Sequence, residues 1–173
     1  IDFNSVDNMI DIGTGAGFPG MVIKIFYPHI NITLLDSNNK KIKFIDELSK
    51  VLHLNIELIN DRVENYSINN LNKFKLVTAR AVANLRVLSE ICLPLVKENG
   101  QFVSLKGNID DSLEDSINTI DIMGGKITKI DKFNLINDDI RNIIVINKTR
   151  NSHKEEIRTY DKILKKPLKK TGK

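Results

Sequence analysis

The sequence predicts an α/β fold with a doubly wound, mostly parallel sheet of seven strands that ends in a C-terminal antiparallel hairpin. Three observations support this prediction. Short apolar runs alternate with helical segments from residue 8 onward, which is typical of consecutive β-α units. A glycine-rich turn follows the first apolar run, where such sheets bind ligands. The last two apolar runs, over 126–133 and 142–148, are joined by the polar turn Asn137-Asp138-Asp139 and predict the hairpin.

The first half of the chain predicts four strands with helices between them. The first strand covers 9–12, and a short helix from Pro19 ends before Pro28 because proline cannot continue a helix. Residues 39–52 place apolar side chains on one face and lysines largely on the other, which predicts an amphipathic helix. The remaining strands of this half are predicted over 32–35, 56–59 and 76–79.

The second half predicts one more strand before the hairpin. A helix is predicted over 85–95, interrupted by Pro94. The dipeptide Asn99-Gly100 is interpreted as a stop signal, and the fifth strand is predicted over 101–105. A further helix is predicted over 110–123, ended by two glycines.

Composition indicates a single globular domain without metal. Of the 173 residues, 41% are hydrophobic and 28% are charged, which argues against wholesale disorder. No apolar run approaches the roughly 20 residues of a membrane-spanning helix, and the N-terminus lacks the pattern of a signal peptide. A single cysteine, Cys92, excludes a disulfide framework and a cysteine metal cluster, and it is predicted to be a buried apolar side chain. We therefore expect a cytoplasmic protein with no membrane or metal partner.

The positive charge of the chain is concentrated at its C-terminus. Residues 149–173 hold nine Lys and Arg but three Asp and Glu, whereas 1–148 carry a small negative excess. We therefore divide the chain into a domain over 1–148 and a basic C-terminal tail over 149–173. Such a tail can bind phosphate backbones without sequence preference. The alternative is a solvated tail with no partner.

The most informative motif is the run from Asp11 to Gly20, Asp-Ile-Gly-Thr-Gly-Ala-Gly-Phe-Pro-Gly, between the first strand and the first helix. Glycine permits positive φ and close approach of a ligand to the backbone. Exposed amides at a helix start favour a carboxylate or phosphate. Asp36 ends the second strand, where nucleoside-binding folds hold ribose hydroxyls. Loop and acid predict a nucleoside cofactor; the alternative is a turn made for packing, with Asp36 as a surface cap.

Four further elements follow this motif in order. They are Leu34-Leu35-Asp36-Ser37 with Lys40-Lys41, Asp61-Arg62-Val63-Glu64, Ala79-Arg80-Ala81 and Leu105-Lys106-Gly107. The glycine run also matches the dinucleotide pattern G-x-G-x-x-G, but its spacing resembles the first motif of class I S-adenosylmethionine methyltransferases. Over residues 9–148 the whole series resembles the bacterial ribosomal RNA small-subunit methyltransferase G family.

The resemblance implies a fold, a cofactor and a substrate. It implies a class I, Rossmann-like methyltransferase that uses S-adenosylmethionine to methylate N7 of a guanine in 16S rRNA, at position 527. Its partner would be 16S rRNA or the small ribosomal subunit, and a monomer is expected. Family members carry a helical segment before the first strand, and we expect most of it to lie outside this sequence.

The resemblance also implies roles for individual residues. Gly13 and Phe18 match the cofactor-contacting positions of the family's loop: the amide of Gly13 would approach the methionine moiety, and Phe18 would shape the loop around it. Val63 and Glu64 would lie beside the adenine, with Glu64 accepting from the amino group. For Phe18 the alternative is a core residue under the loop, and for Glu64 it is an exposed acid.

Two basic residues follow the fourth and fifth strands, at the edge of the sheet where ligands bind. Arg80 would bind the cofactor, because its planar fork can hold a carboxylate or phosphate through two parallel hydrogen bonds. Lys106 would bind the substrate through an RNA phosphate. Each has a plain surface cation as its alternative.

No residue stands out as a catalytic general base. Guanine N7 carries a lone pair and no proton, so its methylation requires placement rather than deprotonation. Methylation of an exocyclic amine would call for an Asn/Asp-Pro-Pro-aromatic element, and the sequence there is Ala79-Arg80-Ala81-Val82. Two other functions stay open: a methyltransferase of a small molecule or protein, and a non-catalytic RNA-binding protein.

Overall fold

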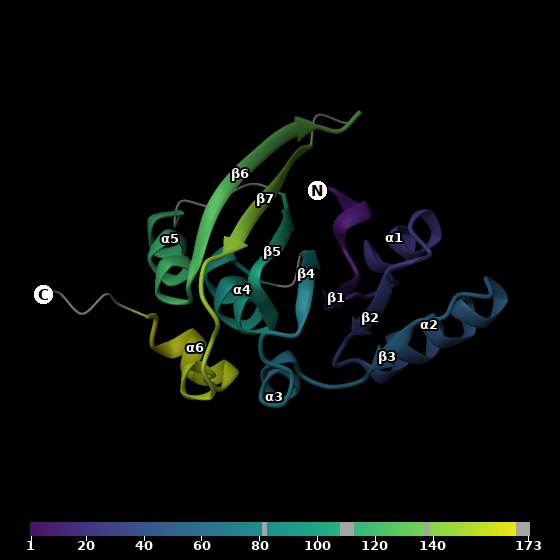
Figure 1. The fold of residues 1–173 in the computed structure, drawn as a ribbon, viewed down its shortest axis with the longest axis horizontal. Coiled ribbons are helices and arrows are strands. Elements are labelled where there is room, and N and C mark those ends of the chain that lie inside the picture. The colour runs from purple at the N-terminus through teal and green to yellow at the C-terminus, as the bar shows by residue number, and fades with distance from the viewer. Residues whose placement is uncertain (81–82, 108–112, 137–138, 169–173) are drawn as a thin grey trace, which may run out of the picture.

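The computed structural model describes residues 1–80, 83–107, 113–136 and 139–168. A seven-stranded sheet with the order β3-β2-β1-β4-β5-β7-β6 runs through the molecule (Figure 1). The strands are β1 Asn8–Ile12, β2 Asn31–Leu35, β3 Glu57–Ile59, β4 Phe74–Arg80, β5 Val96–Lys106, β6 Gly125–Asn134 and β7 Ile140–Lys148. The helices are α1 Gly20–Phe26, α2 Asn39–Val51, α3 Val63–Ser67, α4 Leu85–Cys92, α5 Leu113–Ile122 and α6 Tyr160–Lys165, with 3-10 turns η1 Phe3–Ser5, η2 Leu93–Leu95 and η3 Lys154–Glu156.

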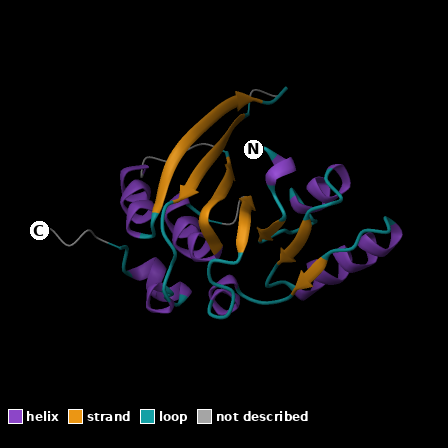
Figure 2. Cartoon of the chain, in the orientation of Figure 1, coloured by secondary structure: helices purple, strands orange, loops and turns teal. Residues whose placement is uncertain are grey.

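The pairing of the strands confirms the predicted fold class. Strands β1 to β5 pair in parallel, and β7 is antiparallel to both β5 and β6. Helices α1 and α2 lie on one side of the sheet, and α4 and α5 lie on the other (Figures 1 and 2). The helix predicted over 110–123 begins at residues 110–112, which lie outside the described residues. The first two residues of the predicted turn, 137 and 138, lie outside them as well.

The core consists of two layers because neighbouring strand residues point to opposite faces of the sheet. Ile10 and Phe102 belong to the cluster that packs under α4 and α5. Met9 and Val103 belong to the cluster that packs under α1 and α2. Cys92 lies in the first cluster and is fully buried, as predicted, and burial raises the pKa of its thiol.

The predicted start of the fifth strand is wrong. Strand β5 begins at Val96, and Asn99-Gly100 forms an irregularity within it rather than a stop. The pairing with β4 shifts register there. Asn99 adopts a positive φ of 61°, and a Cβ on Gly100 would lie 2.8 Å from the carbonyl oxygens of Lys75 and Lys97. The dipeptide lets the chain bulge and rejoin the sheet.

The described part of the segment that follows β7, residues 149–168, packs against the rest of the domain. Ile163 of α6 is 1% exposed, and its carbonyl oxygen accepts a hydrogen bond from Arg86 of α4. Arg158 binds the carboxylate of Glu90 through Nε and Nη2, and the Nη2–Oε2 distance is 2.7 Å. The Glu90 side chain is fully buried, so this ion pair ties Arg158 to α4.

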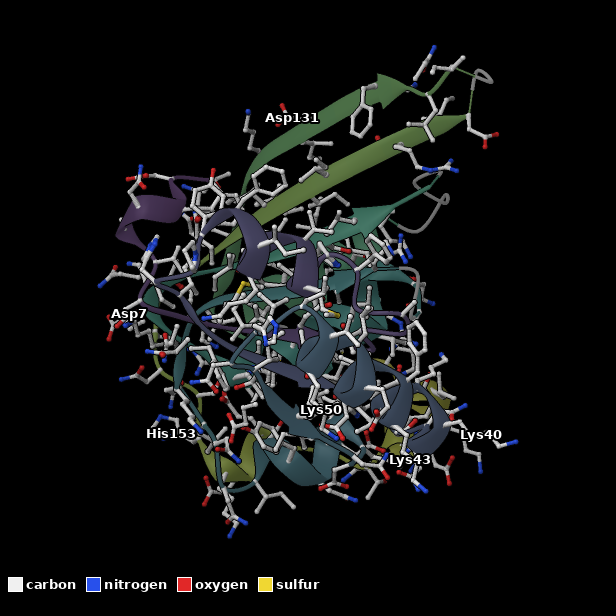
Figure 3. All side chains as sticks on the ribbon, turned by 90° about the vertical axis from the view of Figure 1, so that its right-hand side faces the viewer. Asp7, Lys40, Lys43, Lys50, Asp131 and His153 are labelled. Atoms are coloured by element: carbon white, nitrogen blue, oxygen red, sulfur yellow. The ribbon has the colours of Figure 1, made fainter. Side chains whose placement is uncertain are left out.

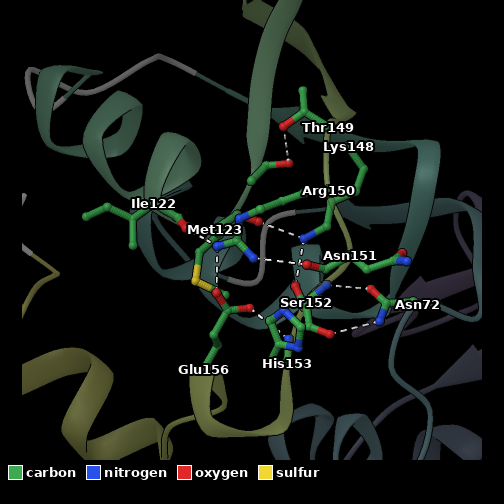
Figure 4. A network of polar contacts seen from close by, with 11 residues as sticks. Asn72, Ile122, Met123, Lys148, Thr149, Arg150, Asn151, Ser152, His153 and Glu156 are labelled. Atoms are coloured by element: carbon green, nitrogen blue, oxygen red, sulfur yellow. Dashed lines mark hydrogen bonds and ion pairs between the residues drawn. The ribbon is translucent and has the colours of Figure 1, made fainter.

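A second polar network joins the end of β7 to the start of that segment (Figure 4). The Lys148 side chain is buried, and its Nζ donates to the carbonyl oxygen of Met123 and to Oγ of Ser152, both at 2.7 Å. Arg150 and Glu156 pair beside it at 2.5 Å. The pKa of Lys148 is lowered to about 8, chiefly by burial and also by the positive charge of Arg150, while Glu156 opposes the change.

Lys148 gives the free energy of unfolding a defined pH dependence. Its pKa is about 8 in the folded protein and returns to the ordinary 10.5 on unfolding. Between these values the unfolded chain binds more protons than the folded chain, so stability rises with pH. Because one pKa unit corresponds to about 1.36 kcal/mol, we expect this lysine to add roughly 2 kcal/mol between pH 7 and pH 10.

Urea unfolding of the wild type and of Lys148→Met at both pH values measures this contribution. The stability difference between the two proteins should change by that amount in favour of the wild type at pH 10. The exposed Lys43 provides the control, since Lys43→Met should leave the difference independent of pH. The prediction would be contradicted if the free energies of unfolding of the wild type and of Lys148→Met differed by the same amount at pH 7 and pH 10.

Candidate functional site

A cleft of about 1100 Å³ opens at the carboxyl edge of the parallel strands. Its wall is formed by the segments that follow β1 to β5 and by the start of β7. The structure brings six of the seven predicted site residues together in this wall: Gly13, Asp36, Val63, Glu64, Arg80 and Lys106. Phe18 does not line this cleft, but its ring contacts the guanidinium of Arg80, which does.

The glycine turn follows β1 and is held by β2. Gly13 and Gly15 adopt positive φ values of 64° and 62°. The N–H groups of Gly13 and Thr14 both donate to the carbonyl oxygen of Leu35, at 2.8 and 3.1 Å. The Gly13 amide is therefore engaged with β2 in this structure, and its approach to the methionine moiety of the cofactor stays a prediction. Gly13 still lines the cleft, with its other atoms.

Asp11 lies beneath the turn and joins three elements. Its Oδ1 accepts a hydrogen bond from the Thr78 hydroxyl of β4 at 2.7 Å, and its Oδ2 accepts from the N–H of Gly20 at 3.2 Å. The side chain is completely buried, and burial raises the pKa of its carboxyl group. Asp11 thus fixes the start of α1 relative to the sheet, which positions the glycine turn between them.

Asp36 connects the glycine turn to the start of α2. Its Oδ2 accepts from the N–H of Gly15 at 3.0 Å, and its Oδ1 accepts from the N–H of Asn38 at 2.9 Å. The Nζ of Lys41 lies 3.7 Å from Oδ2. The residue is 5% exposed, so it is not a surface cap. A carboxylate offers about four acceptor positions, and these two amide bonds leave capacity for a ligand hydroxyl.

The segment after β3 forms the far end of the cleft. Val63 is buried in the core, so only its backbone is available to a ligand. Glu64 is not the exposed acid of the alternative interpretation, since its side chain is 12% exposed and accepts from Nε of Arg62 at 2.6 Å. The guanidinium of Arg62 in turn lies 5.1 Å from the ring centroid of Tyr160.

Arg80 ends β4 and extends into the solvent-accessible part of the cleft. Its guanidinium carbon lies 5.4 Å from the ring centroid of Phe18. Phe18 is 48% exposed, so it is not the core residue of the alternative interpretation. The aromatic face orients the guanidinium by a cation–π contact.

Lys106 lies in the wall past β5, where the sequence placed it, but its ammonium is already engaged. Its Nζ donates to the carbonyl oxygen of Ala83 at 2.5 Å. Its first structural role is therefore to hold the segment that follows β4.

Several residues in the wall were missed by the sequence analysis. The hairpin contributes Phe133 and Arg141, and Asn142 donates to the carbonyl oxygen of Gly107 at 2.5 Å. Tyr160 comes from α6, in the segment that follows β7. No local pattern marks these positions, because they reach the cleft only through long-range packing.

Two searches of the described part of the chain were negative. Among the residues placed by the structure, no group of three or more His, Cys, Asp or Glu side chains is arranged to hold a metal ion. No helix in the same residues has the length and apolar character needed to cross a membrane.

Comparison with known proteins identifies close relatives of this sequence. Residues 1–134 match the family model described as rRNA small subunit methyltransferase G. The chain is 44% identical over 160 residues to the ribosomal RNA small subunit methyltransferase G of Bacillus subtilis (strain 168), covering 90% of this chain and 67% of that protein. It is 42% identical over 173 residues to the protein of the same name from Clostridium perfringens (strain SM101 / Type A), covering 97% and 72%.

Solved structures with little sequence similarity share the fold. StiE O-MT superposes with a TM-score of 0.68 at 12% identity and covers 91% of this chain and 73% of its own. A variant of the 16S rRNA (adenine(1408)-N(1))-methyltransferase from Catenulisporales acidiphilia gives a TM-score of 0.68 at 9% identity, covering 86% and 88%. These likenesses establish the class I methyltransferase fold.

Proposed function

This chain belongs to the rRNA small subunit methyltransferase G family, and on that premise we propose that it transfers a methyl group from S-adenosylmethionine to N7 of a guanine in 16S rRNA. The observation that carries the proposal is a single cleft that joins the glycine turn, Asp36 and Arg80. The cytoplasm, where ribosomal RNA is made into subunits in bacteria, is the corresponding location.

The residues of the cleft fit a nucleoside that carries an amino acid. The buried carboxylate of Asp36 keeps acceptor capacity for ribose hydroxyls. The guanidinium of Arg80 provides a planar cation for a carboxylate. The segment after β3, with Val63 and Glu64 at the start of α3, offers a site for a base. When bound, S-adenosylmethionine supplies an electrophilic methyl group on a sulfonium sulfur.

The protein's own contribution to the reaction is placement and charge. Guanine N7 presents an in-plane lone pair without a proton, so no side chain has to remove one. Placement in line with the methyl group can supply much of the rate enhancement. A base within RNA reaches such a cleft only when it is unstacked, which favours a single-stranded loop as the substrate.

Labelled S-adenosylmethionine supplied with naked 16S rRNA, intact small subunits and a panel of small molecules tests the proposal. We expect incorporation into RNA as 7-methylguanine at one position, mapped by nuclease digestion and mass spectrometry. Label on an exocyclic amine, on a protein or on a small molecule would contradict it. S-adenosylhomocysteine binding without any transfer would favour the non-catalytic RNA-binding alternative.

The basic C-terminal residues are proposed to add RNA affinity without specifying the base. Truncation is an unsuitable test, because removing Arg158 would leave the buried Glu90 unpaired. The double substitution Lys165→Gln and Lys166→Gln changes two exposed cations at the end of α6 instead. Since each phosphate contact contributes about 0.7 to 0.9 to the slope of log K against log salt, we expect the slope to decrease by about 1 to 2.

Filter binding of 16S rRNA fragments over a salt series measures this slope. The control is Lys40→Gln with Lys43→Gln, which removes two exposed cations from the outer surface of α2 (Figure 3). An equal decrease in both double variants would indicate a general charge effect rather than a contact by the C-terminal segment.

A further inference from the structure

Tyr160 brings the C-terminal segment into the cleft. It is the first residue of α6 and lines the cleft together with Asp61, Arg62 and Glu64, which follow β3. We infer that Tyr160 and Arg62 form a stacking wall for the adenine of the cofactor, so that the segment after β7 contributes to cofactor affinity. This inference rests on the proposed function.

The position of Tyr160 is fixed by the packing around it. Its ring packs against the main core cluster. One turn later, Ile163 is buried and its carbonyl oxygen accepts from Arg86 at 3.1 Å. Two residues earlier, Arg158 forms its ion pair with the buried Glu90. Contacts on both sides therefore hold the ring in place, as a preorganised binding surface requires.

Arg62 extends the aromatic surface with a second planar group. Its guanidinium lies over the Tyr160 ring at 5.1 Å, and its Nε donates to Glu64 at 2.6 Å. The Arg62 side chain is 53% exposed, so it can move aside or stack when a ligand enters. Aromatic rings and guanidinium planes are the groups on which nucleobases stack in proteins.

With Arg80 as the proposed partner of the methionine carboxylate, the sheet order favours the adenine of the cofactor over a base of the RNA at Tyr160. Tyr160 contacts the segment after β3, whereas Arg80 ends β4. These strands are three inter-strand spacings apart in the order β3-β2-β1-β4, about 14 Å. With Asp36 between them at the end of β2, the methionine end falls at Arg80 and the base falls at Tyr160. The hairpin residues Phe133 and Arg141 line the opposite part of the cleft.

The composition of the chain allows a direct optical test. It contains no tryptophan and three tyrosines. Tyr27 stacks on Phe3, and neither Tyr27 nor Tyr66 lines the cleft. Addition of S-adenosylhomocysteine should therefore change tyrosine fluorescence chiefly through Tyr160. Tyr160→Phe should retain the affinity measured by calorimetry but lose most of this fluorescence change, which a purely structural role of Tyr160 would not cause.

The affinity test uses Tyr160→Ala, with Leu164→Ala as the control. Leu164 lies on the same helix but is 48% exposed and does not line the cleft. We expect Tyr160→Ala to weaken binding of S-adenosylhomocysteine and of adenosine by the same factor, about tenfold, and Leu164→Ala to bind as the wild type does.

Wild-type affinity of Tyr160→Ala, or an unchanged fluorescence response of Tyr160→Phe, would overturn the inference and leave the proposed cofactor intact. If Tyr160→Ala unfolds at too low a temperature for its affinity to be measured, the fluorescence response of Tyr160→Phe tests the inference instead. Failure of the wild-type protein itself to bind S-adenosylhomocysteine would overturn the proposed function together with this inference.

Discussion

Gly15→Val is expected to lower the affinity for S-adenosylhomocysteine about a hundredfold or more. Gly15 has a φ of 62°, a conformation that β-branched residues almost never adopt. Its Cβ would face open space, with the carbonyl oxygen of Gly13 nearest at 3.9 Å, so the added side chain takes room at the wall of the cleft. A hundredfold loss corresponds to about 2.7 kcal/mol.

The same substitution is also expected to disturb the ribose site. The N–H of Gly15 donates to Asp36 at 3.0 Å, so a turn that moves to relieve strain also releases this carboxylate. Gly107→Ala is the matched control, because Gly107 lines the same cleft and, among the residues that the structure describes, the nearest atom to a Cβ there would be Arg141 Nη1 at 4.0 Å. Calorimetry on both variants measures the effect; near-wild-type affinity of Gly15→Val would remove the glycine turn from the cofactor site.

Arg80→Ala is expected to reduce methyl transfer ten- to a hundredfold with little effect on folding. A hydrogen bond to a charged group is worth about 1.5–3 kcal/mol, and each 1.4 kcal/mol corresponds to a factor of ten. Arg80 is exposed, so its removal leaves the core intact. Its contact with the half-exposed Phe18 ring is weak by comparison.

Arg80→Lys separates the charge of this side chain from its shape. An ammonium keeps the positive charge but cannot reproduce a planar fork, so we expect only partial recovery of activity. The measurement compares methyl incorporation into small-subunit RNA with the thermal midpoint of each purified variant. Normal turnover in Arg80→Ala, or a loss that only follows early melting, would contradict a binding role for Arg80.

The fold was largely predictable because its signals are local. The β1 and β2 strands are short apolar runs, and α2 is a 3.6-residue repeat of apolar side chains. Such patterns report which residues leave water, and burial of apolar surface decides the layers of the sheet. The short helices α3 and α6 were missed, because five or six residues are too few for a helical period to emerge.

The positions of several residues in the cleft wall were predictable because each of them directly follows a strand. Gly13, Asp36 and Arg80 each follow a strand, and parallel strands bring their carboxyl ends to one edge. The hydrogen-bond and ion-pair partners of the residues in the cleft were not predictable. The engaged amide of Gly13, the pairing of Glu64 with Arg62 and the engaged ammonium of Lys106 depend on neighbours that the motif does not name.

The sequence by itself determined that this chain forms a doubly wound sheet with a glycine turn and an acid at its carboxyl edge, because strand periodicity and turn chemistry act over a few residues. Only the tertiary structure decided that residues 149–168 of the basic C-terminal segment pack against α4. Glu90 and Arg158 are 68 positions apart, and nothing in the local pattern of either predicts their pairing. A buried carboxylate requires a cation; which cation meets it, and therefore which aromatic ring reaches the cleft, depends on how the whole chain packs.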